Sequence, residues 1–304
     1  MNETRAGFVA LIGAPNAGKS TLINALIGEK VSIVTHKAQT TRSTVRGVLT
    51  QGEAQIVFLD TPGLFQPRRR LDRAMVASAW GAAADADLVA LLIDSRREAA
   101  QSHVSEETQA ILDGLAGVAR PKVLVLNKID AIERPGLLGL AERLNAALRF
   151  DETFMVSALE RDGLDRLVER LVALTPPGPW LYPEDQIADA PIRSLAAEIT
   201  REKLIERLHD ELPYQATVET DSWKEKPDGS ARVEQTIFIT RESHRKIVLG
   251  EGGRTIKAIG QAARRDIAAA HGAEVHLFLH VKVRERWQDD PERYRAMGLD
   301  FPKR

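Results

Sequence analysis

Four short segments of this chain carry residues whose types and spacing suit the binding of a phosphorylated nucleotide. They are GAPNAGKS at residues 13–20, DTPG at 60–63, NKID at 127–130 and SAL at 157–159. The first matches G-x-x-x-x-G-K-[ST], in which backbone N–H groups surround phosphate oxygens, the lysine reaches the β and γ phosphates and the hydroxyl meets Mg²⁺. We therefore expect Lys19 and Ser20 to bind a nucleoside triphosphate and its metal ion.

The second segment is expected to detect the terminal phosphate. Asp60 ends an apolar run at residues 55–59, so its carboxylate should lie at the tip of a strand and hold Mg²⁺ through water. Gly63 allows the backbone to approach closely, so its N–H group can donate to a γ-phosphate. The pattern predicts a site that distinguishes triphosphate from diphosphate.

The third and fourth segments predict recognition of guanine. NKID follows an apolar, strand-like run, so the Asp130 carboxylate can accept hydrogen bonds from N1 and N2 of guanine, two donors that adenine lacks. Asn127 is expected to support this loop and Lys128 to lie along the base plane. Ser157 and Ala158 should supply a backbone contact to guanine O6.

The composition allows two globular domains and excludes several kinds of protein. The chain has 304 residues, of which 43% are hydrophobic and 28% charged, enough for two separate cores. It contains no cysteine, which excludes disulfides and thiolate metal sites and fits a reducing cytosol. No run of about 18 apolar residues and no signal-peptide pattern occurs, so we expect a soluble protein. Because the net charge is −1, a polyanionic partner must be held by a local basic patch.

The elements that must position the four segments form an alternating pattern up to residue 175. Strand-like runs lie at 8–12, 45–49, 55–59, 88–94, 122–126 and 153–156, with helical stretches between them. This alternation predicts a doubly wound α/β sheet, and the segments follow strands, where such sheets bind ligands. The stretch 175–185 contains four prolines and predicts an interdomain linker.

Beyond the linker the predicted elements follow another order. They are a helix at 193–209, a hairpin of strands at 215–225 and 231–240, helices at 243–248 and 254–270, and a strand at 273–283. Gly250, Glu251, Gly252 and Gly253 join the last two helices. An α-β-β-α-α-β order with a G-x-x-G turn is the layout of a type II KH domain, whose turn clamps single-stranded nucleic acid.

The expected fold class is therefore an α/β P-loop GTPase with a doubly wound sheet, followed by an α+β type II KH domain. The expected divisions are a GTP-binding switch domain at 1–175, a linker at 176–190, a KH domain at 191–286 and a C-terminal tail at 287–304.

Local charge favours RNA as the partner of the second domain. Residues 241–286 contain ten basic side chains against five acidic ones. Glu251 departs from this pattern because its carboxylate would face phosphate, so the clamp is expected to use backbone N–H groups with Lys246, Arg254 and Lys257. The histidines of this region show no metal-ligand spacing; they are His244, His271, His276 and His280.

With these motifs in place, the chain resembles the Era family of bacterial GTPases, which carry a C-terminal KH domain, over nearly its whole length. The four segments and KAQTTR at 37–42 occur in the family's order, and KIVLGEGGRTIKAIG at 246–260 resembles its KH turn and following helix. The resemblance implies binding of small-subunit, 16S-type ribosomal RNA near its 3′ end and a role in small-subunit assembly. It also implies a cytoplasmic protein with a peripheral contact at the inner face of the cell membrane.

The resemblance places the first switch loop at KAQTTR and offers Thr41 as the residue that closes on Mg²⁺ when γ-phosphate is bound; Thr40 is the alternative. Hydrolysis is expected to be slow. Ras-like GTPases carry a glutamine directly after D-x-x-G to orient water, whereas this chain has Leu64, which cannot form a hydrogen bond through its side chain. Asn16 resembles the asparagine that helps hold K⁺ near the transferred phosphate in related GTPases with a hydrophobic residue there, although it could also be a turn former.

These arguments define the predicted site residues. The catalytic residues are Lys19, Thr41, Gly63 and Asn16, and the Mg²⁺ ligands are Ser20, Thr41 and Asp60. GTP is expected to contact Gly13, Ala14, Pro15, Asn16, Ala17, Gly18, Lys19, Ser20, Thr21, Asp60, Thr61, Pro62, Gly63, Asn127, Lys128, Asp130, Ser157, Ala158 and Leu159. RNA is expected to contact Lys246, Gly250, Glu251, Gly252, Gly253, Arg254 and Lys257.

Two other functions stay open at this point. The chain could be a GTP-dependent docking module whose KH-like domain binds a protein, or a GTPase that acts at the membrane or on tRNA. A basic groove favours RNA, and turnover of GTP would separate an enzyme from a docking module. The sequence predicts no oligomeric state.

Overall fold

The computed structural model describes residues 4–37, 40–209 and 212–302, and its contacts divide the chain into two compact units. The N-terminal unit comprises Met1–Ser32, Thr41–Asp189 and Met297–Arg304, and the C-terminal unit comprises Ile33–Thr40 and Ala190–Ala296. Ala38 and Gln39 of the predicted switch loop lie outside the described residues.

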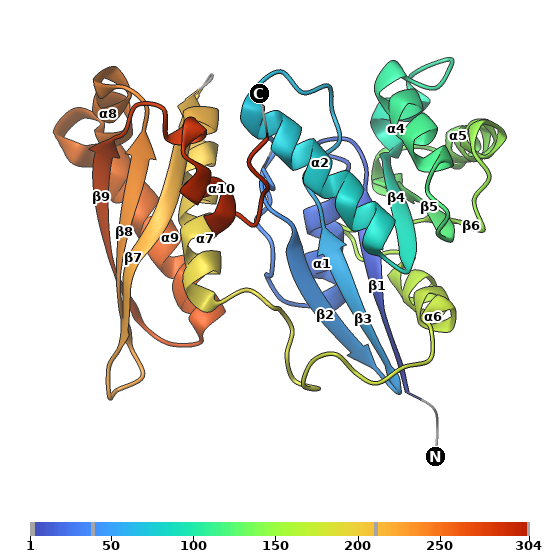
Figure 1. Cartoon of the computed structure of the whole chain (residues 1–304), viewed down its shortest axis with the longest axis horizontal. Helices are drawn as coiled ribbons and strands as arrows, with labels where there is room; N and C mark the ends of the chain where they lie inside the picture. The colour runs from blue at the N-terminus through green and yellow to red at the C-terminus, as the bar shows by residue number, and fades with distance from the viewer. Residues whose placement is uncertain (1–3, 38–39, 210–211, 303–304) are drawn as a thin grey trace. The chain divides into compact units, whose positions relative to one another are not determined.

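The N-terminal unit is built on a six-stranded sheet in the order β2-β3-β1-β4-β5-β6 (Figure 1). Every neighbouring pair is parallel except β2 and β3, which are antiparallel. The predicted doubly wound sheet is confirmed, with an antiparallel edge that the hydrophobic pattern did not indicate. The strands are β1 (Arg5–Ile12), β2 (Val45–Gln51), β3 (Ala54–Asp60), β4 (Leu88–Asp94), β5 (Lys122–Asn127) and β6 (Glu152–Met155).

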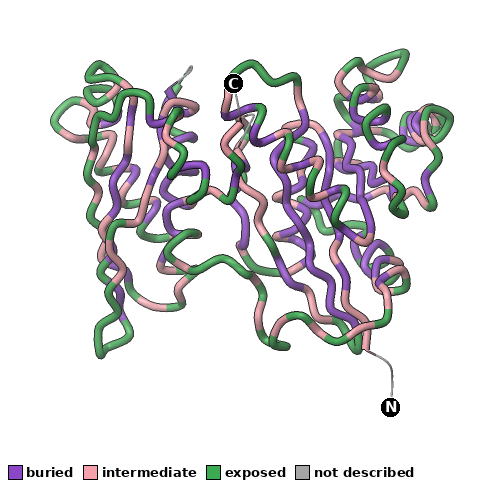
Figure 2. The backbone as a smooth tube through the Cα atoms, in the orientation of Figure 1, coloured by how far each residue is buried: buried purple, intermediate pink, exposed green. Residues whose placement is uncertain are grey.

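Helices cover both faces of this sheet, so its central strands are predominantly apolar. Val9 and Leu11 pack on one side with α1 (Lys19–Ile27) and α6 (Leu164–Leu174). Ala10 and Ile12 pack on the other side, against the remaining long helices. These are α2 (Arg70–Asp85), α4 (Glu106–Ala116) and α5 (Arg134–Ala147), and the short α3 (Ser95–Ala99) follows β4. All seven residues of β3 are buried (Figure 2), as two-sided burial of a parallel sheet requires.

The proline-rich segment after α6 is held against the N-terminal unit. The amide of Gln55, whose side chain is fully buried, donates to the Tyr182 carbonyl at 2.9 Å and accepts from the Leu181 and Tyr182 N–H groups at 2.8 and 2.9 Å. The residues expected as a linker are therefore ordered on the sheet, because one buried glutamine satisfies their backbone groups.

The C-terminal unit has a three-stranded sheet in the order β7-β8-β9. Strands β7 (Ala216–Glu225) and β8 (Ala231–Ile239) are antiparallel, and β8 pairs in parallel with β9 (Val275–Val283). The helices are α7 (Ile192–Arg207), α8 (Glu242–Leu249) and α9 (Arg254–His271). This is the predicted KH element order.

Residues expected as a C-terminal tail contain structure of their own. The short helix α10 (Pro291–Ala296) follows β9, and both Trp287 and Tyr294 are almost completely buried. Within the described ranges, no helix is both long and apolar enough to cross a bilayer.

Candidate functional site

The phosphate loop connects β1 to α1 and surrounds a buried lysine. Gly18 is the N-cap residue of α1, with φ at 98°, and a Cβ there would lie 2.2 Å from the Asn127 amide nitrogen, so only glycine fits. The Lys19 ammonium donates to the Gly13 and Ala14 carbonyls at 3.0 Å each. Burial lowers the pKa of Lys19 to about 8, although the Asp60 charge opposes this. The ammonium therefore lies inside the loop, close to where phosphate oxygens would bind.

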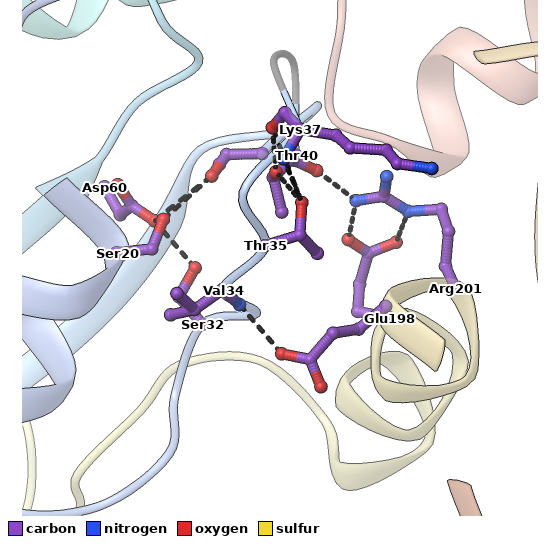
Figure 3. A network of polar contacts seen from close by, with 11 residues as sticks. Ser20, Ser32, Val34, Thr35, Lys37, Thr40, Asp60, Glu198 and Arg201 are labelled. Atoms are coloured by element: carbon purple, nitrogen blue, oxygen red, sulfur yellow. Dashed lines mark hydrogen bonds and ion pairs between the residues drawn. The ribbon is translucent and has the colours of Figure 1, made fainter. Parts of the chain in front are cut away.

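Three predicted metal ligands, Ser20, Thr41 and Asp60, come together at the start of α1, and Figure 3 shows Ser20 and Asp60 in contact. Asp60 Oδ2 accepts from the Ser20 hydroxyl at 2.7 Å, and the Thr41 hydroxyl lies 3.0 Å from Ser20 Oγ and 3.4 Å from Asp60 Oδ2. Asp60 is fully buried, and its Oδ1 has no hydrogen-bond partner among the described residues. Hard oxygen donors with one unsatisfied carboxylate oxygen fit Mg²⁺. Thr40 lies elsewhere, since its hydroxyl bonds to Thr35 Oγ1 at 2.7 Å.

Ser32 also contacts this cluster, a role that sequence reasoning missed. Its hydroxyl donates to Asp60 Oδ2 at 2.6 Å, and its backbone carbonyl accepts from the Asn24 amide at 2.8 Å. Burial raises the pKa of Asp60, while the hydrogen bonds from Ser32 and Ser20 lower it. Ser32 therefore orients the carboxylate. Its only sequence signal is one small polar residue between two aliphatic ones.

A metal site can also be made of histidine and carboxylate side chains. In the part of the chain that the structure describes, no group of three or more histidine, aspartate or glutamate side chains could hold a metal ion.

The DTPG loop lies directly against the phosphate loop. The Thr61 hydroxyl donates to the Leu11 carbonyl at 2.7 Å, and the Leu64 N–H donates to the Gly13 carbonyl at 3.0 Å. A Cβ on Gly63 would lie 2.8 Å from the Pro15 backbone, so glycine is required for this approach. Leu64 is 3% exposed and packs in an apolar cluster. Its side chain is therefore part of the core.

The guanine-recognition segments are tied to the phosphate loop by Asn127. Its amide donates to the Ala17 carbonyl at 2.9 Å, and its carbonyl accepts from the Ala158 N–H at 3.1 Å. The Ser157 hydroxyl donates to the Asp130 carboxylate at 2.5 Å. One side chain thus connects the phosphate, base and SAL loops.

Lys128 makes a second connection to the phosphate loop. Its ammonium donates to the Asn16 carbonyl at 2.7 Å and pairs with Asp94 at the end of β4 at 2.5 Å. Asn16 has φ at 64° and an exposed side chain. Asp94 is a second residue that sequence reasoning missed. Leu159, predicted to contact the nucleotide, is 73% exposed.

The C-terminal unit carries the glycine turn, residues 250–253, between α8 and α9. Gly250 has φ at 71°, and a Cβ there would lie 2.2 Å from the Thr255 hydroxyl; Gly252 and Gly253 have φ at 58° and 77°. Glu251 forms an ion pair with Arg254, so its charge is partly neutralised. Lys246 and Lys257, which flank the turn, are exposed.

The chain matches two protein families and is similar to named proteins over nearly its whole length. Residues 8–128 match the family described as 50S ribosome-binding GTPase, and residues 211–288 match the KH domain family. It is 62% identical to GTPase Era of Afipia carboxidovorans over 302 residues, which cover 99% of this chain and 96% of that protein. It is 60% identical to GTPase Era of Brucella suis over 300 residues, with coverage of 99% and 95%.

Two solved structures resemble the chain over almost its whole length. One is Era in complex with MgGDPNP and nucleotides 1506–1542 of 16S ribosomal RNA, with a TM-score of 0.90, 36% identity, and coverage of 97% of this chain and 99% of that one. The other is a variant of Aquifex aeolicus Era bound to GDP and AlF4⁻, with the same score, identity and coverage.

Proposed function

The chain belongs to the Era family of GTPases, and from this we propose that it is a GTP-hydrolysing switch that binds small-subunit ribosomal RNA near its 3′ end and assists small-subunit assembly. The observation that carries the proposal is the presence of both parts in one chain. The N-terminal unit has the four nucleotide loops in contact with one another, and the C-terminal unit has the glycine turn. The likeness to an Era complex with a GTP analogue and a 16S fragment supports pairing these two ligands.

We propose that the phosphate loop binds the triphosphate through its backbone N–H groups and Lys19. The N-terminus of α1 adds partial positive charge at the same position. Ser20, Thr41 and Asp60 would hold Mg²⁺, which when bound neutralises charge on the β and γ oxygens. The close approach of Gly63 to Pro15 supports a backbone contact from the DTPG loop to the γ-phosphate.

Guanine specificity is assigned to Asp130, which Ser157 orients. The carboxylate accepts from two guanine donors that adenine does not have, so adenine would leave a charged acceptor without partners. Asn127 holds this loop against the phosphate loop, so recognition of the base and of the phosphates depends on one geometry.

The group that activates hydrolysis is proposed to be K⁺ held near Asn16. Burial of Leu64 in the apolar core leaves position 64 without a side chain that could orient water. The bond from Lys128 to the Asn16 carbonyl fixes the backbone, and the amide side chain is exposed. A monovalent cation there would offset negative charge that develops on the transferred phosphate.

RNA binding is assigned to the glycine turn and to the basic side chains that flank it. Backbone N–H groups of the turn can approach phosphates closely because Gly250, Gly252 and Gly253 have no side chains. Exposed Lys246 and Lys257 add charge beside them, and the ion pair with Arg254 reduces the unfavourable effect of Glu251.

The functional divisions at 1–175, 176–190, 191–286 and 287–304 stay our proposal, as does a peripheral contact with the inner face of the cell membrane, which only the family resemblance supports. The proposed function is tested with purified protein by measuring GTP turnover and binding to an RNA of the 16S 3′ region against a scrambled RNA of equal length. We expect turnover of GTP but not ATP, and preference for the 16S sequence. Equal binding of both RNAs would contradict the assigned partner.

A further inference from the structure

Residues 33–37 and Thr40 of the chain pack as part of the C-terminal unit. Ile33 is 2% exposed and lies in an apolar cluster formed by α7, β8, α9 and β9, with Ile199 and Ile267 among its members. An isoleucine buried to this degree fixes its backbone, because extracting it would expose apolar surface and leave a cavity. The segment that enters the predicted switch loop is therefore anchored in the KH core.

A buried carboxylate of α7 holds the next residue. The Val34 N–H donates to Glu202 Oε1 at 2.8 Å, and Glu202 is 2% exposed. Its Oε2 lies 2.9 Å from Lys203 Nζ, which also lies 2.8 Å from Asp266 of α9. Burial would lower the pKa of Lys203, but hydrogen bonds with Asp266 and Glu202 raise it above its usual value. Lys203 is thus charged at neutral pH and holds the Glu202 carboxylate in place for Val34.

Arg201, which precedes Glu202 in α7, holds the other end of the segment at Thr40. Its guanidinium donates to the Thr40 carbonyl and to Glu198 (Figure 3). The Arg201 side chain is 1% exposed, and its Nη1 has no hydrogen-bond partner among the described residues. Burying an arginine with one unsatisfied nitrogen costs free energy of folding, so stability alone does not explain this residue. Its contact with the Thr40 carbonyl suggests a positioning role.

The residues that directly flank this segment belong to the magnesium cluster. Ser32 bonds to Asp60 at 2.6 Å and precedes Ile33, and Thr41 contacts Ser20 at 3.0 Å and follows Thr40. One peptide bond at each end therefore separates a residue held by α7 or the KH core from a residue at the metal cluster. A peptide unit is planar and stiff, so where Arg201 holds the Thr40 carbonyl determines the position of the Thr41 nitrogen and Cα, from which the Thr41 hydroxyl extends.

We propose that Arg201 and Glu202 are positioning residues of the GTPase reaction: by holding both ends of the Ile33–Thr40 segment on α7, they set the Thr41 hydroxyl for Mg²⁺ and the γ-phosphate. Lys203 and Asp266 link Glu202 to α9, the helix that begins at the glycine turn, so the carboxylate that holds Val34 is fixed by two helices of the same unit. This inference rests on the proposed function and assigns its regulation to named side chains.

The test compares Arg201→Met, Arg201→Lys and the control Arg207→Met, an exposed arginine of the same helix, in the full-length chain. Affinities for GDP and for a non-hydrolysable GTP analogue are measured while Mg²⁺ is titrated. Arg201→Met should lower the affinity for the GTP analogue about tenfold, the effect of losing one charge-assisted hydrogen bond. It should also raise the Mg²⁺ concentration needed for half-maximal binding of the analogue, and the affinity for GDP should not change. Arg201→Lys should recover part of the loss because lysine keeps a donor for the carbonyl. Arg207→Met should match the wild type.

A merely structural role would give another result, in which both nucleotides weaken equally and the thermal unfolding midpoint falls. That outcome, or analogue affinity equal to the wild type, would overturn the proposal.

Hydrogen exchange of the wild-type chain gives a second test that no folding defect can obscure. With the GTP analogue and Mg²⁺ present, the Val34 amide should exchange as slowly as core amides of α9, and exchange at the rate of an open loop would overturn the proposal. If the wild type failed to turn over GTP, the proposed function would fail, whereas this amide measurement would still decide the positioning role.

Discussion

Asn127 connects three loops through one amide, so Asn127→Ala should weaken nucleotide binding strongly. Its side chain is 2% exposed, donates to the Ala17 carbonyl at 2.9 Å and accepts from the Ala158 N–H at 3.1 Å. The substitution leaves two buried backbone groups without these partners. At about 1–3 kcal/mol for each unsatisfied group, the total loss should be about 2–6 kcal/mol. If half of that loss appears in binding, GDP affinity should fall between about fivefold and about 150-fold.

The assay is the dissociation rate of fluorescent GDP, measured together with the thermal unfolding midpoint. Asn145→Ala is a matched control, because the Asn145 amide also donates to a backbone carbonyl, that of Ala141 at 2.9 Å, but in an exposed position. We expect faster GDP release and a lower midpoint for Asn127→Ala and little change for Asn145→Ala. An unchanged release rate in a folded Asn127→Ala protein would refute the reasoning that this amide holds the loops together.

Three further predictions concern the base, the activating cation and the RNA clamp. Asp130→Asn should bind xanthine nucleotides in place of guanine nucleotides, because an amide donates where the carboxylate accepted; equal affinity of the wild type for ATP and GTP in competition assays would contradict this. Replacing Na⁺ with K⁺ should raise GTP turnover, and Asn16→Gly, which tolerates the φ of 64°, should abolish the increase; turnover indifferent to K⁺ would exclude the cation. Gly252→Asp places a carboxylate where no atom lies within 4 Å of the added Cβ and should weaken RNA binding about tenfold at low salt, whereas equal loss in Gly252→Asn would implicate shape instead of charge.

Local sequence patterns predicted most of the fold because the strands, helices and loops involved are specified by nearby residues. The apolar run 88–94 is β4, and the loops that follow strands carry the predicted nucleotide motifs. The KH element order was also predictable, because the hairpin and the glycine turn each have a local signature. The hydrophobic pattern did not indicate that β2 runs antiparallel, since buried strands of either direction have the same composition.

Parts of the candidate site could not be predicted because they depend on contacts between distant residues. Val34 and Glu202 are separated by 168 positions, and nothing near either residue indicates the other. Ser32 and Asp94 likewise act on Asp60 and Lys128 through side chains that match no motif. Arg201 likewise bonds to the Thr40 carbonyl across 161 positions of the chain, a contact that no local pattern indicates.

The two units exchange short pieces of chain, which bears on how the protein can be divided. A gene fragment that encodes only residues 190–296 would lack Ile33, leaving a gap in the apolar cluster that it helps to fill. The complementary fragment ending at residue 189 would lack Leu299, which is 3% exposed, and Phe301, whose ring lies 4.9 Å from the Arg70 guanidinium. Loss of a buried isoleucine lowers the free energy of unfolding by about 2–5 kcal/mol. Two fragments divided at the proline-rich segment should therefore fold poorly when produced alone, and more of each should fold when the two are produced together.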